Sequence, residues 1–119
     1  MNTGGDPFCS DIDAFMADND DFLVLVAAGN SGRDGPLSVG SPATAKNCVA
    51  VGATDNVPAT SGGSSPDSIA VFSSLGPTDG GRIKPDVTAP GAPVASASSD
   101  SGCEYVELQV LHFTIANGY

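Results

Sequence analysis

Short apolar runs, separated by stretches rich in glycine, serine and proline, dominate the chain and predict β-strands. Residues 23–28 and 48–53 are apolar at nearly every position, which is typical of parallel strands buried on both faces. Four shorter or alternating runs predict further strands at residues 69–72, 86–89, 94–97 and 105–109. The pattern therefore predicts a sheet that is mainly parallel.

One helical pattern precedes these strands. Residues 10–17 place Ile12, Phe15 and Met16 on one face at the i, i+3, i+4 spacing, and Ser10 is the predicted N-cap. The connections after residue 30 contain no second helical pattern, although parallel strands need crossover connections that are usually helical. The expected fold class is α/β, with part of a parallel sheet and few of the helices that should cover it.

Composition fits one small globular domain. The chain has 119 residues, and its hydrophobic content of 40% is too high for a disordered protein. Charged residues make up only 15%, whereas 15 glycines and 9 prolines supply many turns. These proportions favour a loop-rich α/β or β fold.

Charge and hydropathy argue against two kinds of partner. The formal net charge is −10, and such an acidic surface repels nucleic-acid phosphates. The longest apolar run, residues 22–28, is far too short to span a bilayer. The first residues lack the basic and apolar segments of a signal peptide. We expect no nucleic-acid partner and no membrane segment, and the compartment stays open.

The three cysteines do not form a metal-binding pattern. Cys9, Cys48 and Cys103 are widely spaced, and their odd number leaves at least one thiol free or paired elsewhere. Cys48 lies in an apolar run and is expected in the core. Cys9 and Cys103 lie in turn-rich stretches, so a disulfide between them remains open.

The most informative feature is the end of the first strand, where the run Val-Ala-Ala-Gly-Asn-Ser-Gly occupies residues 26–32. An asparagine placed here can direct its side-chain amide out of the end of a buried strand. Such an N–H donor can stabilise negative charge that develops on a reacting carbonyl oxygen. The alternative is a simple turn, because asparagine and glycine both tolerate positive φ. Asn30 is thus either a catalytic donor or a turn residue.

Three segments together resemble the subtilisin-like serine proteases (subtilases, peptidase family S8). They read LVLVAAGNSG at residues 23–32, VGSPATAKNCVAVGA at residues 39–53, and FSSLGP continuing to KPDVTAPG at residues 72–91. In this order and spacing they are specific, and the resemblance covers roughly residues 11–109. It implies that residues 1–109 are part of a subtilisin-like parallel-sheet domain, carrying its later strands. Residues 110–119 are expected to fall outside the family.

The resemblance also implies roles for individual residues. Asn30 matches the asparagine of the family's oxyanion hole. Four residues match the pocket for the side chain that precedes the scissile bond, as one wall or as the floor: Ala27, Ala28, Gly29 and Gly40. The carbonyl groups of Ala43, Ala45 and Cys48 match a weak cation site of some relatives, although a purely structural role is favoured for them. No other metal or cofactor is implied.

The catalytic triad of the family is not found in this sequence. Its aspartate and histidine belong to Asp-Thr/Ser-Gly and His-Gly-Thr motifs, and its serine belongs to a Gly-Thr-Ser-Met-Ala motif. The aspartate and histidine motifs of the family precede the segment of Asn30, and neither does so here; the letters Asp-Ser-Gly at residues 100–102 follow that segment. No Gly-Thr-Ser-Met-Ala motif occurs, and residues 110–119 stand near the place where it is expected. The one histidine, His112, lies outside every family-like segment and is interpreted as a bystander.

The sequence thus predicts a fragment of a subtilisin-like endopeptidase that is inactive alone. The parent protein would act on peptides or proteins and is expected in the extracellular space or the secretory pathway. Two alternatives stay open: a non-catalytic peptide-binding or regulatory module, and a mispredicted or pseudogene product. Because the strands lack helical cover, we expect an isolated chain that is marginally stable and prone to assemble.

Overall fold

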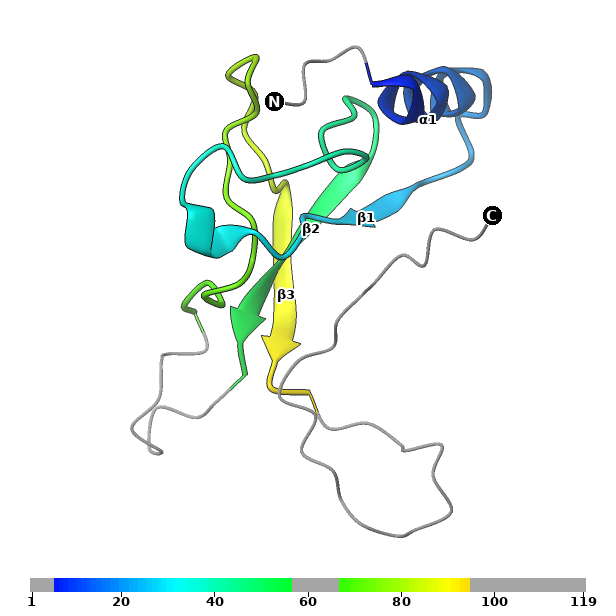
Figure 1. Ribbon diagram of the computed structural model, residues 1–119. Helices are drawn as coiled ribbons and strands as arrows, with labels where there is room; N and C mark the ends of the chain where they lie inside the picture. The colour runs from blue at the N-terminus through cyan, green and yellow to red at the C-terminus, as the bar shows by residue number, and fades with distance from the viewer. Residues whose placement is uncertain (1–5, 57–66, 95–119) are drawn as a thin grey trace, which may run out of the picture.

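Three parallel strands form the sheet of the computed structural model, which describes residues 6–56 and 67–94 (Figure 1). The order of elements is α1 (Pro7–Asp18), β1 (Leu25–Ala27), the 3-10 turn η1 (Gly32–Asp34), β2 (Val49–Asp55) and β3 (Val87–Ala92). The sheet order is β1-β2-β3, and both pairs are parallel. These features confirm the α/β prediction of a parallel-sheet fragment with few helices.

The two faces of the sheet differ in burial. We define the closed face by Val26, Ala50, Gly52 and Thr54, which are all buried. We define the open face by residues that are exposed or half-buried: Leu25, Ala27, Val49, Val51, Ala53, Val87 and Ala89. Side chains along β2 alternate strictly between the two faces. The prediction that residues 23–28 are buried on both faces is therefore wrong, since Leu25 is 63% exposed.

The core lies on the closed face. It is a cluster of small apolar side chains contributed by α1, by strands β1 and β2 and by the connection between these strands: Cys9, Val26, Ala28, Val39, Ala43, Ala45, Cys48 and Ala50. Ile12 and Met16 of α1 pack against this cluster. Phe15, which the sequence placed on the same face as Ile12 and Met16, does not join them in the core; it is 48% exposed and packs edge-to-face on Phe22.

Helix α1 begins earlier than expected. Asp6, not Ser10, is the N-cap, and its carboxylate accepts a hydrogen bond of 3.0 Å from the Phe8 N–H. Pro7 takes the first helical position, where its fixed φ is favourable and its missing N–H does no harm. The Asp-Pro pair is thus the stronger start signal, and Ser10 lies inside the helix.

The later strands differ from their prediction in two places. Residues 69–72 form no strand; Ile69 makes only an isolated antiparallel bridge to Thr54. Strand β3 continues through Pro90 and Gly91, where the prediction had it end, because parallel pairing persists past a register shift beside Thr54. Val94 lies in no strand, and residues 95–97, 105–109 and 110–119 fall outside the described residues.

A charged pair holds β3 to β2. Lys84 Nζ lies 2.6 Å from Asp86 Oδ2 and also donates to the carbonyl of Cys48 at 2.9 Å. The same Asp86 oxygen accepts the N–H of Ala50 at 2.7 Å, and the Asp86 N–H donates to the Ala50 carbonyl. Burial alone would raise the pKa of Asp86, but these hydrogen bonds and the Lys84 charge outweigh it and lower that pKa.

Candidate functional site

A groove of about 880 Å³ crosses the open face and reaches the loops that follow β1. The groove is lined by all five residues that the sequence assigned to oxyanion stabilisation or the substrate pocket: Ala27, Ala28, Gly29, Asn30 and Gly40. Its far side is formed by β2 and β3, and Ile12 of α1 contributes at one end. The structure therefore brings the predicted site residues together around one cavity, whereas their roles stay a prediction.

The turn after β1 depends on Gly29. Its φ is +112°, and a Cβ atom at this position would lie 2.8 Å from Ser74 Oγ. Among the described residues other than glycine, Leu37 alone has a positive φ. Asn30 therefore does not adopt the left-handed conformation that would explain an asparagine as a simple turn former.

The side chain of Asn30 is exposed and lines the groove. Within residues 6–56 and 67–94 its amide makes no hydrogen bond. An amide N–H that is held at the end of a strand and left unbonded can donate to an oxygen of a ligand in the groove. Within the described residues, Asn30 therefore lacks the hydrogen bonds of a structural asparagine.

Two adjacent buried serines connect the loop of Asn30 and strand β2 to a distant segment. Ser74 Oγ accepts the N–H of Ser31 at 3.0 Å, and the Ser74 N–H donates to the Gly29 carbonyl at 3.0 Å. Ser73 Oγ accepts the N–H of Ala53 at 2.9 Å, near the end of β2. The backbone on both sides of Asn30 is thus fixed from a segment more than forty residues away in the chain.

The sequence alone treated residues 72–91 only as scaffold and gave Ser73 and Ser74 no individual role. Both are almost completely buried, with 2% and 1% exposure, although serine is usually a surface residue. A pair of adjacent serines that ends an apolar run is the only signal that could have suggested this positioning role.

The loop with Gly40 forms another side of the groove. Gly40 is half-buried, and Ser38, two residues earlier, is paired with the same distant segment. The Leu75 N–H donates to Ser38 Oγ at 2.8 Å, and the Ser38 N–H donates to the Leu75 carbonyl at 2.8 Å. Residues 73–75 therefore position both the Asn30 loop and the Gly40 loop.

The carbonyl groups of the possible cation site are already engaged. The Cys48 carbonyl accepts the Lys84 ammonium, a positive charge that would repel a bound cation. The carbonyls of Ala43 and Ala45 lie 3.9 and 3.7 Å from the Cys48 sulfur, which occupies the space between them. These contacts support the structural role that the sequence favoured for this loop.

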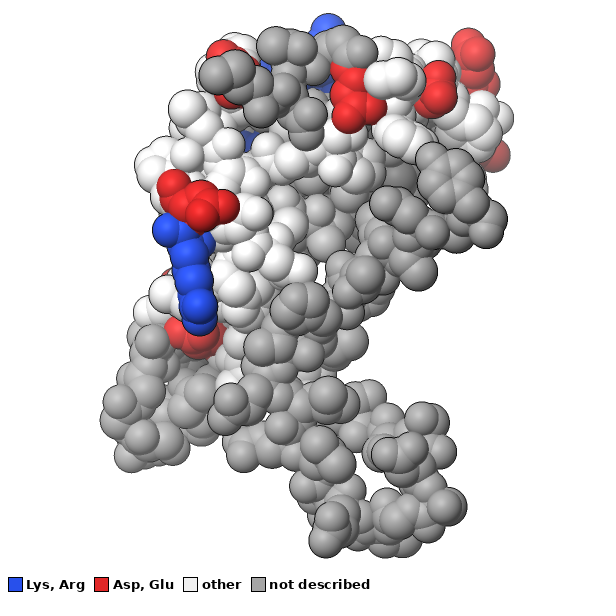
Figure 2. Space-filling view, in the orientation of Figure 1, with Lys and Arg blue, Asp and Glu red and all other residues white. Residues whose placement is uncertain are grey.

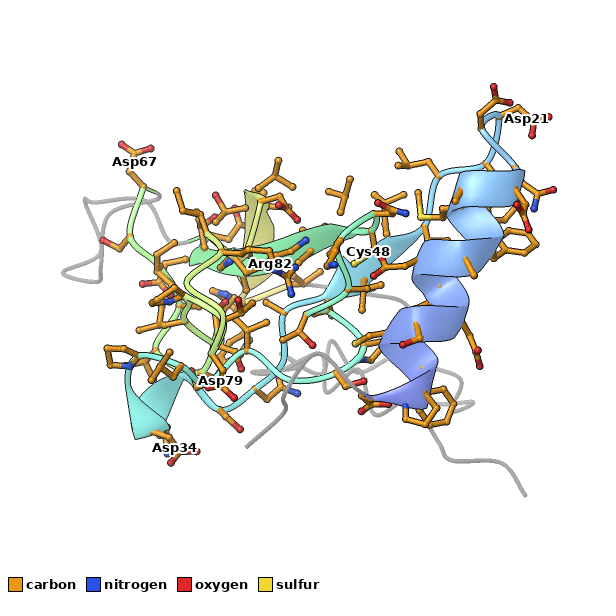
Figure 3. All side chains as sticks on the ribbon, turned by 90° about the horizontal axis from the view of Figure 1, so that it is seen from above. Asp21, Asp34, Cys48, Asp67, Asp79 and Arg82 are labelled. Atoms are coloured by element: carbon orange, nitrogen blue, oxygen red, sulfur yellow. The ribbon has the colours of Figure 1, made fainter. Side chains whose placement is uncertain are left out.

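The acidic side chains that the structure describes do not gather into a second site. In Figure 3, Asp21, Asp34, Asp67 and Asp79 lie at separate places around the edge of the molecule. No group of three or more potential metal-ligating side chains exists within the described residues. The described surface that faces the viewer in Figure 2 is mostly uncharged, and its charged side chains lie toward the edges. The part of the chain that the structure describes contains no helix long and apolar enough to cross a membrane.

The described lining of the groove contains an unpaired amide but no side chain that could act as a general base. This described lining includes five serines but no histidine, carboxylate, lysine or arginine. A serine hydroxyl becomes a nucleophile only when a neighbouring base accepts its proton. The described lining of the groove therefore contains no side chain that could activate one of these serines.

A family model and two curated proteins are similar to this chain, and all three are named as subtilases, serine proteases or subtilisin-like proteases. A family model described as the subtilase family (Peptidase S8) matches residues 1–115. The match includes part of residues 110–119, which were expected to lie outside the family. The boundary at residue 109 stays a prediction. The chain is 44% identical to the serine protease AprX of Bacillus subtilis (strain 168) over 77 residues, which is 65% of the chain. It is 33% identical to the subtilisin-like protease SBT6.1 of Arabidopsis thaliana over 106 residues, which is 82% of the chain. The chain spans only 17% and 9% of the lengths of these relatives.

Proposed function

The chain belongs to the subtilase family, and from this premise we propose that it supplies part of the catalytic site of a subtilisin-like serine endopeptidase. Its contribution is the oxyanion-hole donor Asn30 and part of the substrate pocket. The substrate of the parent enzyme is a peptide or protein, and the reaction is hydrolysis by acyl transfer. The family's aspartate, histidine and serine would come from outside this chain.

The observation that carries the proposal is the unbonded, exposed side chain of Asn30 at the groove. In acyl transfer, attack on a carbonyl moves negative charge onto its oxygen, and a preorganised donor lowers the energy of that state. The Ser31 N–H and the Gly29 carbonyl on either side of Asn30 are both bonded to Ser74. The backbone that carries the donor is therefore fixed before substrate binds, which supports a preorganised site.

The pocket residues suit an apolar substrate side chain. Ala27, Ala28 and Gly29 line one wall with little side-chain bulk, and Gly40 leaves space on the opposite loop. No ionisable side chain lines the described part of the groove. A large apolar group would thus enter without facing an unpaired charge.

The chain alone should not react as a serine hydrolase. A fluorophosphonate probe labels serines that a neighbouring base has activated, and no base lines the described groove. We expect no labelling of the purified chain, measured by intact mass, under conditions where an active subtilisin is labelled completely. Stoichiometric modification of one serine would contradict the proposal.

A chimera tests the contribution directly. Residues 6–94 would replace the matching segment of AprX, which supplies the remaining catalytic groups. We expect this chimera to fold and to hydrolyse a peptide substrate. A folded chimera with no detectable activity would contradict the proposal that these residues complete such a site.

A non-catalytic peptide-binding module is the second candidate. It is favoured by one observation: the groove is open and lined, in its described part, without any acid–base group. The two functions differ in the isolated chain, since the module would bind an extended apolar peptide and leave it intact. Calorimetry with such a peptide, followed by mass analysis of the peptide, separates them.

A further inference from the structure

Two buried cysteines approach each other between α1 and the loop that precedes β2. Cys9 is 4% exposed and Cys48 is 3% exposed, and both are free thiols. Each sulfur lies 3.8 Å from the carbonyl oxygen of Pro42. The two sulfur atoms are therefore no further apart than twice that distance, and both belong to the same core cluster.

Oxygen atoms surround the two thiols, which is unusual for a core of small apolar side chains. The sulfur of Cys9 lies 3.2 Å from Thr44 Oγ1 and 3.5 Å from Ser41 Oγ. The sulfur of Cys48 lies within 3.9 Å of three backbone carbonyls of the same loop: those of Pro42, Ala43 and Ala45. In Figure 3, Cys48 lies in the interior on the side of the sheet next to α1.

We propose that Cys9 and Cys48 form an oxidation site, at which a small disulfide such as oxidised glutathione converts the two thiols into an intramolecular disulfide. One thiol loses its proton and attacks a sulfur of oxidised glutathione, which releases the first glutathione as a thiol. The second thiol loses its proton and attacks the mixed disulfide, which releases the second glutathione. Two S–H bonds of the protein are lost and one S–S bond forms, while the S–S bond of the oxidant breaks and its two sulfurs are reduced.

The environment of Cys48 opposes the loss of its proton. Burial raises the pKa of its thiol, so the thiolate that attacks a disulfide is scarcer here than at an exposed cysteine. The charged groups around Cys48 act in both directions: Lys84 lowers its pKa, whereas Asp86 and Asp13 raise it.

The disulfide would reinforce a contact that is already present between α1 and the loop. Asp13 Oδ1 accepts the N–H groups of Lys46 and Asn47, each at 2.8 Å, and the Asn47 amide donates to the Asp13 carbonyl. These bonds join the helix to the loop on one side, and the thiol pair joins them on another.

The consequence for the groove rests on the proposed function, whereas the disulfide itself does not. Ile12 of α1 and residues 40–42 of the loop both line the groove. A covalent link between Cys9 and Cys48 fixes these two walls relative to each other. Oxidation would then set the width of this end of the groove.

The pairing differs from the one that the sequence left open, between Cys9 and Cys103. Cys103 lies outside the described residues, whereas Cys9 and Cys48 share a carbonyl contact. The Cys103→Ser variant therefore keeps the proposed site, and it removes the competing thiol from the experiment.

The test is a redox titration of Cys103→Ser with mixtures of reduced and oxidised glutathione, approached both from the fully reduced and from the fully oxidised chain. We expect a monomer lighter by two hydrogen atoms, and peptide mapping without reductant should join the Cys9 and Cys48 peptides. The native chain should form this disulfide at about tenfold higher values of the squared concentration of reduced glutathione divided by that of oxidised glutathione than the urea-unfolded chain, because each disulfide formed releases two glutathione thiols. Cys48→Ala in the same background is the matched control, and it should carry glutathione on Cys9 alone.

Each other result would overturn the inference. Thiols that stay free in the native chain at ratios that oxidise the unfolded chain would show that the fold opposes the bond. Mixed disulfides or dimers as the final products would show that the two sulfurs cannot meet. In the wild-type chain, a Cys9–Cys103 linkage as the main product would assign Cys9 a different partner.

Discussion

The closed and open faces of the same three strands differ in what holds them. On the closed face, Ala50 is fully buried and Val26 is 9% exposed, and the apolar cluster with α1 covers them. On the open face, Leu25 is 63% and Val87 is 49% exposed, and the groove crosses the residues between them. One face therefore stabilises the fold, and the other presents the candidate site.

This difference explains how a small chain can hold the loop of Asn30 in place. The segment at residues 73–75 bonds to the loops with Asn30 and Gly40 from the closed side, so these loops do not depend on cover over the open face. Parallel sheets are normally covered on both faces by helices. Within residues 6–56 and 67–94, a helix covers only the closed face of this sheet.

The largest difference between the two faces is expected when the same positive charge is introduced on each of them. Ala50→Lys buries an unpaired ammonium among apolar side chains, and we expect it to cost more than about 4 kcal/mol and to unfold the chain. Leu25→Lys, on the open face, should change the free energy of unfolding by less than about 0.5 kcal/mol. Circular dichroism and urea titration measure both. If Leu25→Lys unfolds the chain as Ala50→Lys does, the open face is in fact packed.

A smaller effect is expected where the Asn30 loop meets the segment that supports it. At Gly32, an added Cβ atom would collide with the Ser73 carbonyl oxygen and lie 2.8 Å from the Phe72 and Ser73 carbonyl carbons. Gly32→Ala should therefore lower the free energy of unfolding by about 2–3 kcal/mol. Gly80→Ala is the matched control, because its nearest neighbour would be Thr78 Oγ1 at 4.0 Å. Equal urea midpoints for the two variants would show that Gly32 is not in close contact with the backbone of residues 72 and 73.

Breaking the Lys84–Asp86 pair should cause a smaller loss of stability than the two destabilising changes above, and this loss should depend on pH. Asp86→Asn leaves the Lys84 ammonium, whose side chain is 3% exposed, without its charged partner. Because the Asp86 side chain is 38% exposed, water screens the pair, and we expect a loss of about 1–2 kcal/mol at pH 7.

The sign of the pH effect follows from the lowered pKa of Asp86. The stabilisation that the ionised Asp86 side chain provides is complete above pH 3.8, the ordinary pKa of the group. It is lost as the pH falls through the lower pKa of Asp86 in the folded state. Urea titrations should therefore show the wild-type advantage over Asp86→Asn shrinking below pH 3.8. An advantage that stays constant in acid would mean that the carboxylate does not carry the effect.

Local patterns predicted β1, β2 and β3 because apolar runs bounded by turn residues are features of neighbouring positions. The same reasoning found Asn30, whose glycine neighbour accounts for the turn. It failed for residues 69–72, whose apolar run meets only one bridge partner at Thr54. A run of four residues does not reveal whether a neighbouring strand is present to pair with it.

Long-range contacts could not be predicted in this way. The bonds from Ser74 to Ser31 and from Asp86 to Ala50 join positions 43 and 36 residues apart. Nothing local to these polar residues distinguishes them from loop residues. The groove likewise became visible only when α1, the loops and the three strands were placed together.

The most direct measurement is the effect of Asn30→Ala on kcat in the chimera of residues 6–94 with AprX. The account predicts a loss of roughly 10²–10³-fold, the magnitude known for this donor in subtilisin rather than one derived from this structure, with little change in KM. Asn56→Ala is the control, because its exposed amide donates only to the Pro93 carbonyl, and it should leave kcat unchanged. A folded Asn30→Ala chimera with the kcat of its parent would contradict the assignment of Asn30 as the oxyanion donor.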